Sequence, residues 1–161
     1  MDDYRAIEIE AANKYGATAK GTRKAIGDFL LNDDIKSPVN VKSNNILKNN
    51  YSPNIISAKR LIKWIEQDGH KLYFIFVNYE STKDGVKYID DSGLLPFEHL
   101  SWNCLTIEAQ GWGVIQMPKP LEVDKNQSKK EFLKGLRKAY EVFMDKEAKK
   151  MDEIRKMISD F

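Results

Sequence analysis

The sequence predicts an α/β fold in which helices flank a mixed sheet of about five strands, with a long helix at the C-terminus. The run from Lys71 to Tyr79 is almost continuously apolar and aromatic, which is typical of a central strand. Val86 to Ile89 is expected to pair back with it after a turn at Lys83–Gly85. Apolar residues also recur at helical spacing near both ends of the chain. Since no internal repeat or linker divides the 161 residues, residues 1–161 are expected to form a single domain.

The first helix is expected between Asp2 and Tyr15, with Asp2 or Asp3 as its cap. Its inner face is expected to carry Tyr4, Ile7, Ala11 and Tyr15. Glu8 falls on the same face, where an unpaired carboxylate would be costly. It is therefore expected in a salt bridge or at the edge of the helix, unless it takes part in a functional site. A polar loop is expected to follow from Gly16 to Thr22.

The next segment predicts a β-hairpin. Ala25 to Leu31 is a short apolar run that contains a single charge, Asp28. Asn32–Asp34 has the composition of a turn. Val39 to Val41 begins the second strand, and Pro38 stands at its entry, where a missing N–H is tolerated.

Asparagine is frequent after this hairpin. It favours turns and disfavours regular elements, so the stretch from Ser43 to Asn54 is expected to be rich in loops. A helix is then expected to begin at Ser52-Pro53, with Ser as the N-cap and Pro in the first turn. Its buried face is expected to consist of Ile55, Ile56, Leu61, Ile62 and Ile65.

The C-terminal helix is the clearest element in the sequence. Ser128 and Glu131 have the spacing of a capping box at its start. An apolar stripe follows, which consists of Phe132, Leu136, Ala139, Tyr140, Phe143, Met151, Ile154 and Ile158. Such a stripe is typical of core packing or of a dimer contact rather than of a cofactor site. Before this helix, residues 105–117 contain strand-like segments interrupted by Gly111 and Gly113.

The composition argues against several classes of site. The net charge of +2 gives no overall signature of a protein that binds polyanions, so nucleic-acid binding has to rest on local contacts. The single cysteine, Cys104, excludes an internal disulfide, and two histidines argue against a Cys/His zinc site. No apolar run approaches the ~18 residues that span a membrane, and the acidic start lacks the features of a signal peptide. We therefore expect a cytoplasmic protein without a membrane partner.

Three hairpin residues form a pattern that suits phosphodiester hydrolysis. Asn40 and Lys42 stand two residues apart on one strand, so both side chains are expected to face Asp28 on the other. Mg²⁺ held between such strands, with a lysine beside the attacking water, can activate the water and neutralise the phosphate. The carbonyl of Val41 is a potential additional ligand. The same spacing also fits a charged pair on a solvated hairpin.

The residues after Lys42 resemble a known family. The stretch SNNILKNNYSPNIISAKRL resembles the segment that follows the active-site lysine in type II restriction endonucleases of the PD-(D/E)xK superfamily, in the group of HincII- and EcoRV-like enzymes. The block Pro53 to Ala58 is shared and lies at a matching distance from the lysine. Weaker similarity extends through residues 71–89, residues 101–103 and the C-terminal helix. The resemblance implies a restriction-endonuclease-like fold, Mg²⁺ as the cofactor and double-stranded DNA as the substrate.

The resemblance also implies roles for the motif residues. Asp28 matches the first metal-binding aspartate, and Lys42 matches the lysine. Asn40 falls on the second metal-binding carboxylate, and here the chain departs from the pattern because an amide oxygen carries no charge. Three explanations are open: an engineered Asp-to-Asn change that traps uncut DNA, replacement of the lost charge by Glu8, or a natural relative that is inactive or altered.

Further residues match or flank DNA-contacting positions of the family. Tyr51 falls where a side chain is inserted at a base step, and its ring could wedge into the stack; a surface tyrosine is the alternative. Asn54 matches a base-contacting position, and its amide suits the edge of adenine. Ser101 and Asn103 match a second base-reading segment. The other expected contacts to bases or phosphates, with turn formation as the alternative for the asparagines, are Asn44, Asn45, Lys48, Asn49, Asn50 and Ser52.

These expectations describe a type II restriction endonuclease that hydrolyses double-stranded DNA with Mg²⁺ at a short (pseudo)palindromic site. A homodimer would match the twofold symmetry of such a site. Two other functions are open: a non-cleaving DNA-binding relative in which Asn40 is disabling, and a repair or structure-specific nuclease of the same fold.

Overall fold

A computed structural model describes residues 2–17, 26–48, 50–108 and 113–161. It divides into two compact units, each described here by itself. The first unit comprises Met1–Pro53 and Arg60–Phe97, and the second comprises Asn54–Lys59 and Glu98–Phe161. The single domain expected from the sequence stays a prediction.

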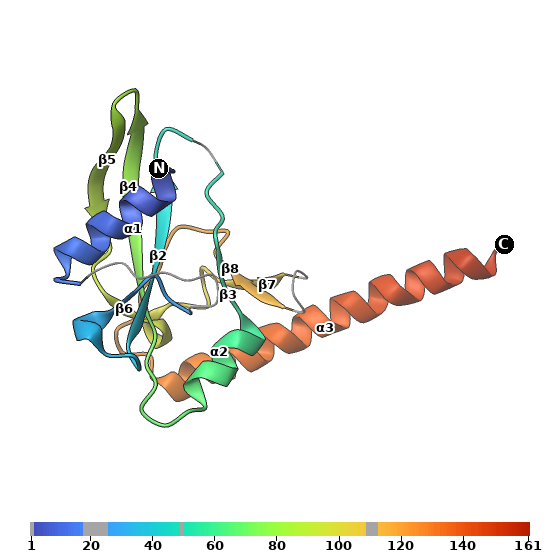
Figure 1. Cartoon of the computed structure of the whole chain (residues 1–161). Helices are drawn as coiled ribbons and strands as arrows, with labels where there is room; N and C mark the ends of the chain where they lie inside the picture. Colours follow the sequence, from blue (N-terminus) through green and yellow to red (C-terminus); the bar gives the residue numbers. More distant parts are fainter. Residues whose placement is uncertain (1, 18–25, 49, 109–112) are drawn as a thin grey trace. The chain divides into compact units, whose positions relative to one another are not determined.

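The first unit contains a mixed five-stranded sheet, as predicted (Figure 1). Its strands are β1 (Phe29–Leu30), β2 (Pro38–Asn45), β4 (Tyr73–Thr82), β5 (Gly85–Asp91) and β6 (Leu95–Pro96). The order is β1-β2-β4-β5, and β6 also pairs with β4. β2 and β4 run parallel, whereas the other pairs are antiparallel. The chain is therefore an α/β protein built on a mixed sheet, with β4 at its centre.

The expected hairpin is present at one edge of this sheet. Phe29 pairs with Val39 in the antiparallel register that joins β1 to β2. The turn between them is a short 3₁₀ helix, η1 (Leu31–Asp33), in which Asn32 and Asp33 have φ of 52° and 57°. Asn and Asp tolerate this left-handed conformation better than other non-glycine residues, which explains the Asn-Asp sequence of the turn.

The helix α1 (Asp3–Lys14) crosses one face of this sheet (Figure 1). The Asp2 side chain caps it by accepting from the Arg5 N–H at 2.8 Å. Ile7 and Ala11 are fully buried against the sheet, as expected. Tyr4 was expected on the same inner face, but its side chain is 63% exposed because the first turn reaches beyond the packed surface.

The segment after β2 differs from the prediction. β2 continues through Asn45 into the asparagine-rich stretch, and Asn44 there donates to Asn78 Oδ1 on β4 at 3.1 Å. The helix expected at Ser52-Pro53 is wrong: a strand, β3 (Asn54–Ser57), comes first, and α2 (Ala58–Ile65) begins after it. Two adjacent β-branched residues in β3 favour the extended chain, and pairing with β8 outweighs the local capping signal. Ile62, expected to be buried, is 39% exposed.

The second unit contains a three-stranded antiparallel sheet in the order β3-β8-β7. Its other strands are β7 (Thr106–Glu108) and β8 (Val114–Gln116), within the region expected to contain strands. Gly111 lies outside the described residues. Along the sequence, the boundary between the two units falls within a short 3₁₀ helix, η2 (Phe97–His99).

The long C-terminal helix is confirmed as α3 (Lys129–Ser159), 31 residues without a break. Ser128 and Glu131 form the predicted capping box. Phe132 is buried against the Trp102 ring, 5.2 Å away between centroids, and the Trp102 indole N–H donates to its carbonyl at 3.0 Å. None of the helices in the described part of the chain is both long and apolar enough to cross a membrane.

Candidate active site

The side chain of Asp28 is fixed against β2 by the backbone. The Asp28 N–H donates to the Val39 carbonyl at 2.7 Å, and Asp28 Oδ2 accepts from the Val41 N–H at 2.6 Å. The preceding Gly27 makes this approach possible, since a Cβ there would lie 2.8–2.9 Å from Pro38 Cβ and the Val39 backbone. The Gly-Asp pair in the sequence therefore reflects close contact between the hairpin strands.

Asn40 and Lys42 alternate along β2 with Val39 and Val41, which are buried in the core. The Asn40 amide nitrogen donates to the Ile26 carbonyl at 3.2 Å, so its oxygen is the atom that could bind a cation. Lys42 is half-buried and close enough to Asp28 for their charges to interact. The structure thus brings together the three motif residues that the sequence predicts to share a site.

Glu8 reaches the same site from α1. Its carboxylate forms a salt bridge with Arg5 at 3.3 Å, which is one of the two expected arrangements. It also lies near the Asp28 carboxylate: burial, followed by the charge of Asp28, raises the pKa of Glu8. The Arg5 charge opposes this shift without cancelling it. Glu8 therefore forms the salt bridge with Arg5 and also lies beside the carboxylate of Asp28.

The electrostatics of the site reflect limited contact with water. Burial raises the pKa of Asp28, although the Val41 N–H and the Lys42 charge act in the opposite direction. Burial likewise lowers the pKa of Lys42, and nearby Arg60 lowers it further, against the effect of Asp28. Two carboxyl groups with raised pKa values, held side by side, form a place where a cation would be stabilised.

The donor set at this place fits a hard cation such as Mg²⁺. Asp28 and Glu8 supply carboxylates, and Asn40 supplies an amide oxygen, the ligand types that Mg²⁺ prefers. The Val41 carbonyl leaves β2 on the same edge as its N–H, which faces Asp28. Across the ranges that the structure describes, no group of three or more His, Cys, Asp or Glu side chains is arranged to hold a metal ion. The candidate set therefore has two carboxylates supplemented by neutral oxygens.

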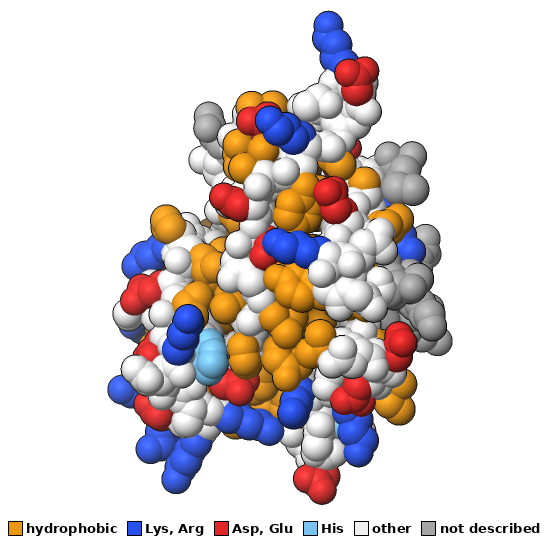
Figure 2. Space-filling model, turned by 90° about the vertical axis from the view of Figure 1, so that its left-hand side faces the viewer, with side chains coloured by type: hydrophobic (Ala, Val, Ile, Leu, Met, Phe, Trp, Pro, Cys, Tyr) orange, Lys and Arg blue, Asp and Glu red, His pale blue; other side chains and the backbone are white. Residues whose placement is uncertain are grey.

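A pocket of about 440 Å³ adjoins this site within the first unit. Six residues that the sequence predicts to contact DNA line it together with Glu8 and Lys42. These six are Asn44, Asn45, Lys48, Asn50, Tyr51 and Ser52. On the face drawn in Figure 2, Lys and Arg side chains are interspersed with Asp and Glu side chains, in keeping with the small net charge. Binding of an anionic polymer would therefore depend on local groups in the pocket.

Tyr51 lies inside this pocket rather than extending into solvent. Its hydroxyl group is buried and has no hydrogen-bond partner in the part of the chain that is described. Burial, with smaller effects from Tyr4 and Tyr79, raises its pKa. Sequence reasoning missed Tyr4 and Tyr79 as pocket residues. The sequence offers no signal for Tyr79, which is itself a buried core residue of β4.

The remaining predicted contacts lie elsewhere. Asn49 is outside the described residues. Asn54, Ser101 and Asn103 belong to the second unit. Ser101 is buried, and its hydroxyl oxygen accepts from the Asn103 N–H at 3.1 Å, while the Asn103 amide donates to Glu122 Oε1 at 3.0 Å. Ser101 and Asn103 thus form local hydrogen bonds in their own unit.

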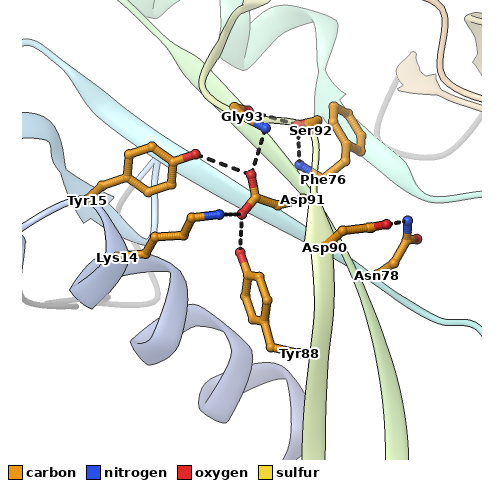
Figure 3. Close-up of polar contacts among 9 residues, drawn as sticks. All are labelled: Lys14, Tyr15, Phe76, Asn78, Tyr88, Asp90, Asp91, Ser92 and Gly93. Atoms are coloured by element: carbon orange, nitrogen blue, oxygen red, sulfur yellow. Dashed lines mark hydrogen bonds and ion pairs between the residues drawn. The ribbon is translucent and has the colours of Figure 1, made fainter.

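A buried carboxylate, Asp91, ties the end of α1 to the sheet (Figure 3). Its side chain is only 3% exposed. Lys14 binds it at 2.5 Å, the Tyr15 and Tyr88 hydroxyl groups donate to it at 3.2 and 2.7 Å, and the Gly93 N–H donates at 2.7 Å. Burial alone would raise the pKa of Asp91, but these contacts hold it below the usual range.

The opposite end of α1 is also attached. The Ser81 hydroxyl group on β4 donates to Asp3 Oδ2 at 3.0 Å. Along α1, Glu8 lies between Asp3 and Lys14, so attachment of both ends of the helix fixes the position of Glu8 beside Asp28. Sequence reasoning missed both, since they join residues more than 75 positions apart.

No protein-family model matches the chain, and no match was found among curated proteins. The case for a function therefore rests on the residues and geometry described above.

Proposed function

We propose that this chain is a Mg²⁺-dependent endonuclease of the type II restriction class, which hydrolyses double-stranded DNA at a short (pseudo)palindromic site as a homodimer. The observation that carries the proposal is the cluster of Asp28, Asn40 and Lys42 on one hairpin, with Glu8 brought beside it. The sequence after Lys42, which resembles restriction endonucleases of the PD-(D/E)xK superfamily, supports the same class.

Hydrolysis of a phosphodiester needs an activated water and neutralisation of the phosphate charge. When bound, Mg²⁺ would supply both. Asp28, Glu8, the Asn40 amide oxygen and the Val41 carbonyl would hold the ion. Lys42 would donate hydrogen bonds to the attacking water or to a phosphate oxygen. Its lowered pKa makes it a better proton donor than an ordinary lysine.

The proposal assigns the second metal-binding carboxylate to Glu8. Asn40 has no charge, and one carboxylate alone would bind Mg²⁺ weakly. The raised pKa of Glu8 supports this assignment, because a carboxylate beside Asp28 gains most when a cation neutralises both. Two features support DNA as the substrate: the asparagines and Lys48 in the adjoining pocket, and the aromatic Tyr51. Asn54, Ser101 and Asn103 are proposed as further base contacts on the sequence resemblance alone, since Ser101 and Asn103 form local hydrogen bonds in this structure.

The test is cleavage of plasmid and of long sequence-diverse DNA in the presence of Mg²⁺. The proposal predicts discrete fragments with the chain as it stands, and no cutting by Asp28→Asn or Lys42→Met. Glu8→Gln should reduce cleavage strongly, whereas the matched control Glu10→Gln, on the exposed side of α1, should leave it unchanged. A smear or cutting confined to junctions would instead identify a repair or structure-specific nuclease.

A non-cleaving DNA-binding protein is the second candidate. The amide at position 40 favours it, since Asn40 stands where the family pattern has a carboxylate. If neither this chain nor Asn40→Asp cuts any DNA, while binding to DNA persists, the second candidate replaces the first.

A further inference from the structure

The second half of α3 is exposed along its whole length. Every residue from Ala148 to Phe161 is exposed, including several large apolar side chains. Met151 and Ile158 are each 67% exposed, and Ile154 is 56% exposed. Figure 1 shows this part of α3 continuing past β7 and β8 of its own unit. Large apolar side chains gathered on an exposed helix mark a surface that is buried against a partner.

These apolar residues follow a seven-residue repeat. Met144, Met151 and Ile158 are seven positions apart, and Ile154 and Phe161 each stand three positions after one of them. Alternate spacings of three and four place Met144, Met151, Ile154 and Ile158 on one seam of the helix, and Phe161 follows just beyond its end. Glu147 occupies the one seam position between them that is not apolar. This spacing is the pattern of a helix that pairs with another helix.

The exposed area matches what a helix pair buries. With about 200 Å² for a large side chain, the four seam residues together with Met157 and Phe161 expose on the order of 800 Å². A stable interface buries about 800 Å² on each partner. An isolated helix shorter than about 12–15 residues is marginal in water, so a contact along this face would stabilise the second half of α3.

We propose that the second half of α3 pairs in antiparallel orientation with the same helix of a second copy of the chain. The charges flanking the seam support this orientation. When Met144 of one copy faces Ile154 of the other, Glu141 of each copy lies opposite Arg155 of the other, so two symmetrical ion pairs form. On the other flank, Phe143 faces Met157, which adds apolar contact.

A parallel pair would be less favourable. It would place Glu147 of one copy against Glu147 of the other inside the seam, where like charges repel at close range. It would also place Lys150 of each copy against Arg155 of the other. In the antiparallel pair, Glu147 instead faces Met151 and lies beside Lys150 of the second copy, while its own Lys150 stays within 3.5 Å. The two Lys150 side chains approach each other there, each accompanied by a Glu147.

The antiparallel pair is twofold symmetric, which agrees with the homodimer in the proposed function but does not depend on nuclease activity. Sedimentation velocity of the full chain over a range of concentrations tests it, and needs neither DNA nor Mg²⁺. The expected result is a reversible dimer of the 18.6-kDa chain. Met151→Lys should raise its dissociation constant at least about tenfold, whereas Val142→Lys, an exposed apolar residue off the seam, should not change it.

A charge swap tests the orientation. Glu141→Arg or Arg155→Glu alone should weaken the dimer, because each places like charges in apposition, and the double variant should restore it. Circular dichroism should show that all variants remain folded. A wild-type chain that stays monomeric overturns the proposal, as does a dimer indifferent to Met151→Lys. A double variant that is no better than either single variant overturns the antiparallel register.

Discussion

Replacing Asp91 by Asn measures how much the buried carboxylate stabilises the folded chain. Two hydrogen bonds to the charged group, from Tyr88 and the Gly93 N–H, are both 2.7 Å long. The amide oxygen can replace only one of the two carboxylate oxygens, and the amide NH2 group then faces a donor at the other position. At 1.5–3 kcal/mol for a hydrogen bond to a charge, the free energy of unfolding should fall by about 2–3 kcal/mol. Lys14 is left out of this figure because it is exposed and water screens its charge.

Thermal unfolding measures this effect. For a chain of this size, a loss of 2–3 kcal/mol lowers Tm by roughly 4–12 °C. The matched control is Asp90→Asn, at the neighbouring exposed carboxylate, which should lower Tm much less. Equal shifts for the two variants would refute the reasoning.

The stabilisation by Asp91 should also depend on pH, in a direction that follows from the pKa of its carboxyl group. Because the folded protein holds the pKa of Asp91 below its usual range, its stabilising contribution is complete above the unfolded pKa of about 4. It is lost as the pH falls through the lower, folded pKa. The difference in unfolding free energy between wild type and Asp91→Asn should therefore be constant near neutral pH and shrink below about pH 4. A difference that stays constant at lower pH would contradict the assignment.

The remaining predictions concern the candidate active site. Glu8→Gln should weaken Mg²⁺ binding about tenfold or more, measured by calorimetry, whereas Asn40→Asp should strengthen it. If both variants bind Mg²⁺ with unchanged affinity, the proposed metal site is wrong. Gly27→Ala should lower the unfolding free energy by about 1–3 kcal/mol, measured in urea, since its Cβ would meet the β2 backbone at 2.9 Å. Tyr51→Phe should leave stability unchanged or raise it by about 1 kcal/mol, because the lost hydroxyl group is buried without a partner; a clear loss would show that the hydroxyl group is bonded.

Local chemistry made part of the fold predictable from sequence. Asp2 and Ser128 cap their helices through contacts within three residues, and such contacts depend on little else in the protein. The apolar run of β4 identified the central strand, because a strand buried on both faces has few polar residues. The alternation along β2 placed Asn40 and Lys42 correctly beside the first strand of the hairpin.

Contacts between distant segments limited the prediction elsewhere. The Ser52-Pro53 pair has the composition of a helix start, yet the chain forms β3 because β8, some 60 residues later, pairs with it. The role of Asp91 could not be predicted from the sequence, because its partners Lys14 and Tyr15 are more than 75 residues away in the chain. From the sequence, Glu8 was expected either in a salt bridge or in the functional site. The sequence could not show that Glu8 pairs with Arg5 and also lies beside Asp28.

The attachment of α1 has a consequence for the order of folding. The β1–β2 hairpin, with Asp28 and Lys42, is local and can form early. Glu8 reaches it only when α1 docks, and the contacts of Lys14 and Tyr15 with Asp91 that hold this helix close loops of 77 and 76 residues. Such long-range closures are slow. A chain still emerging from the ribosome would therefore carry the lysine and one carboxylate, while the pair of carboxylates is completed only when β5 is in place.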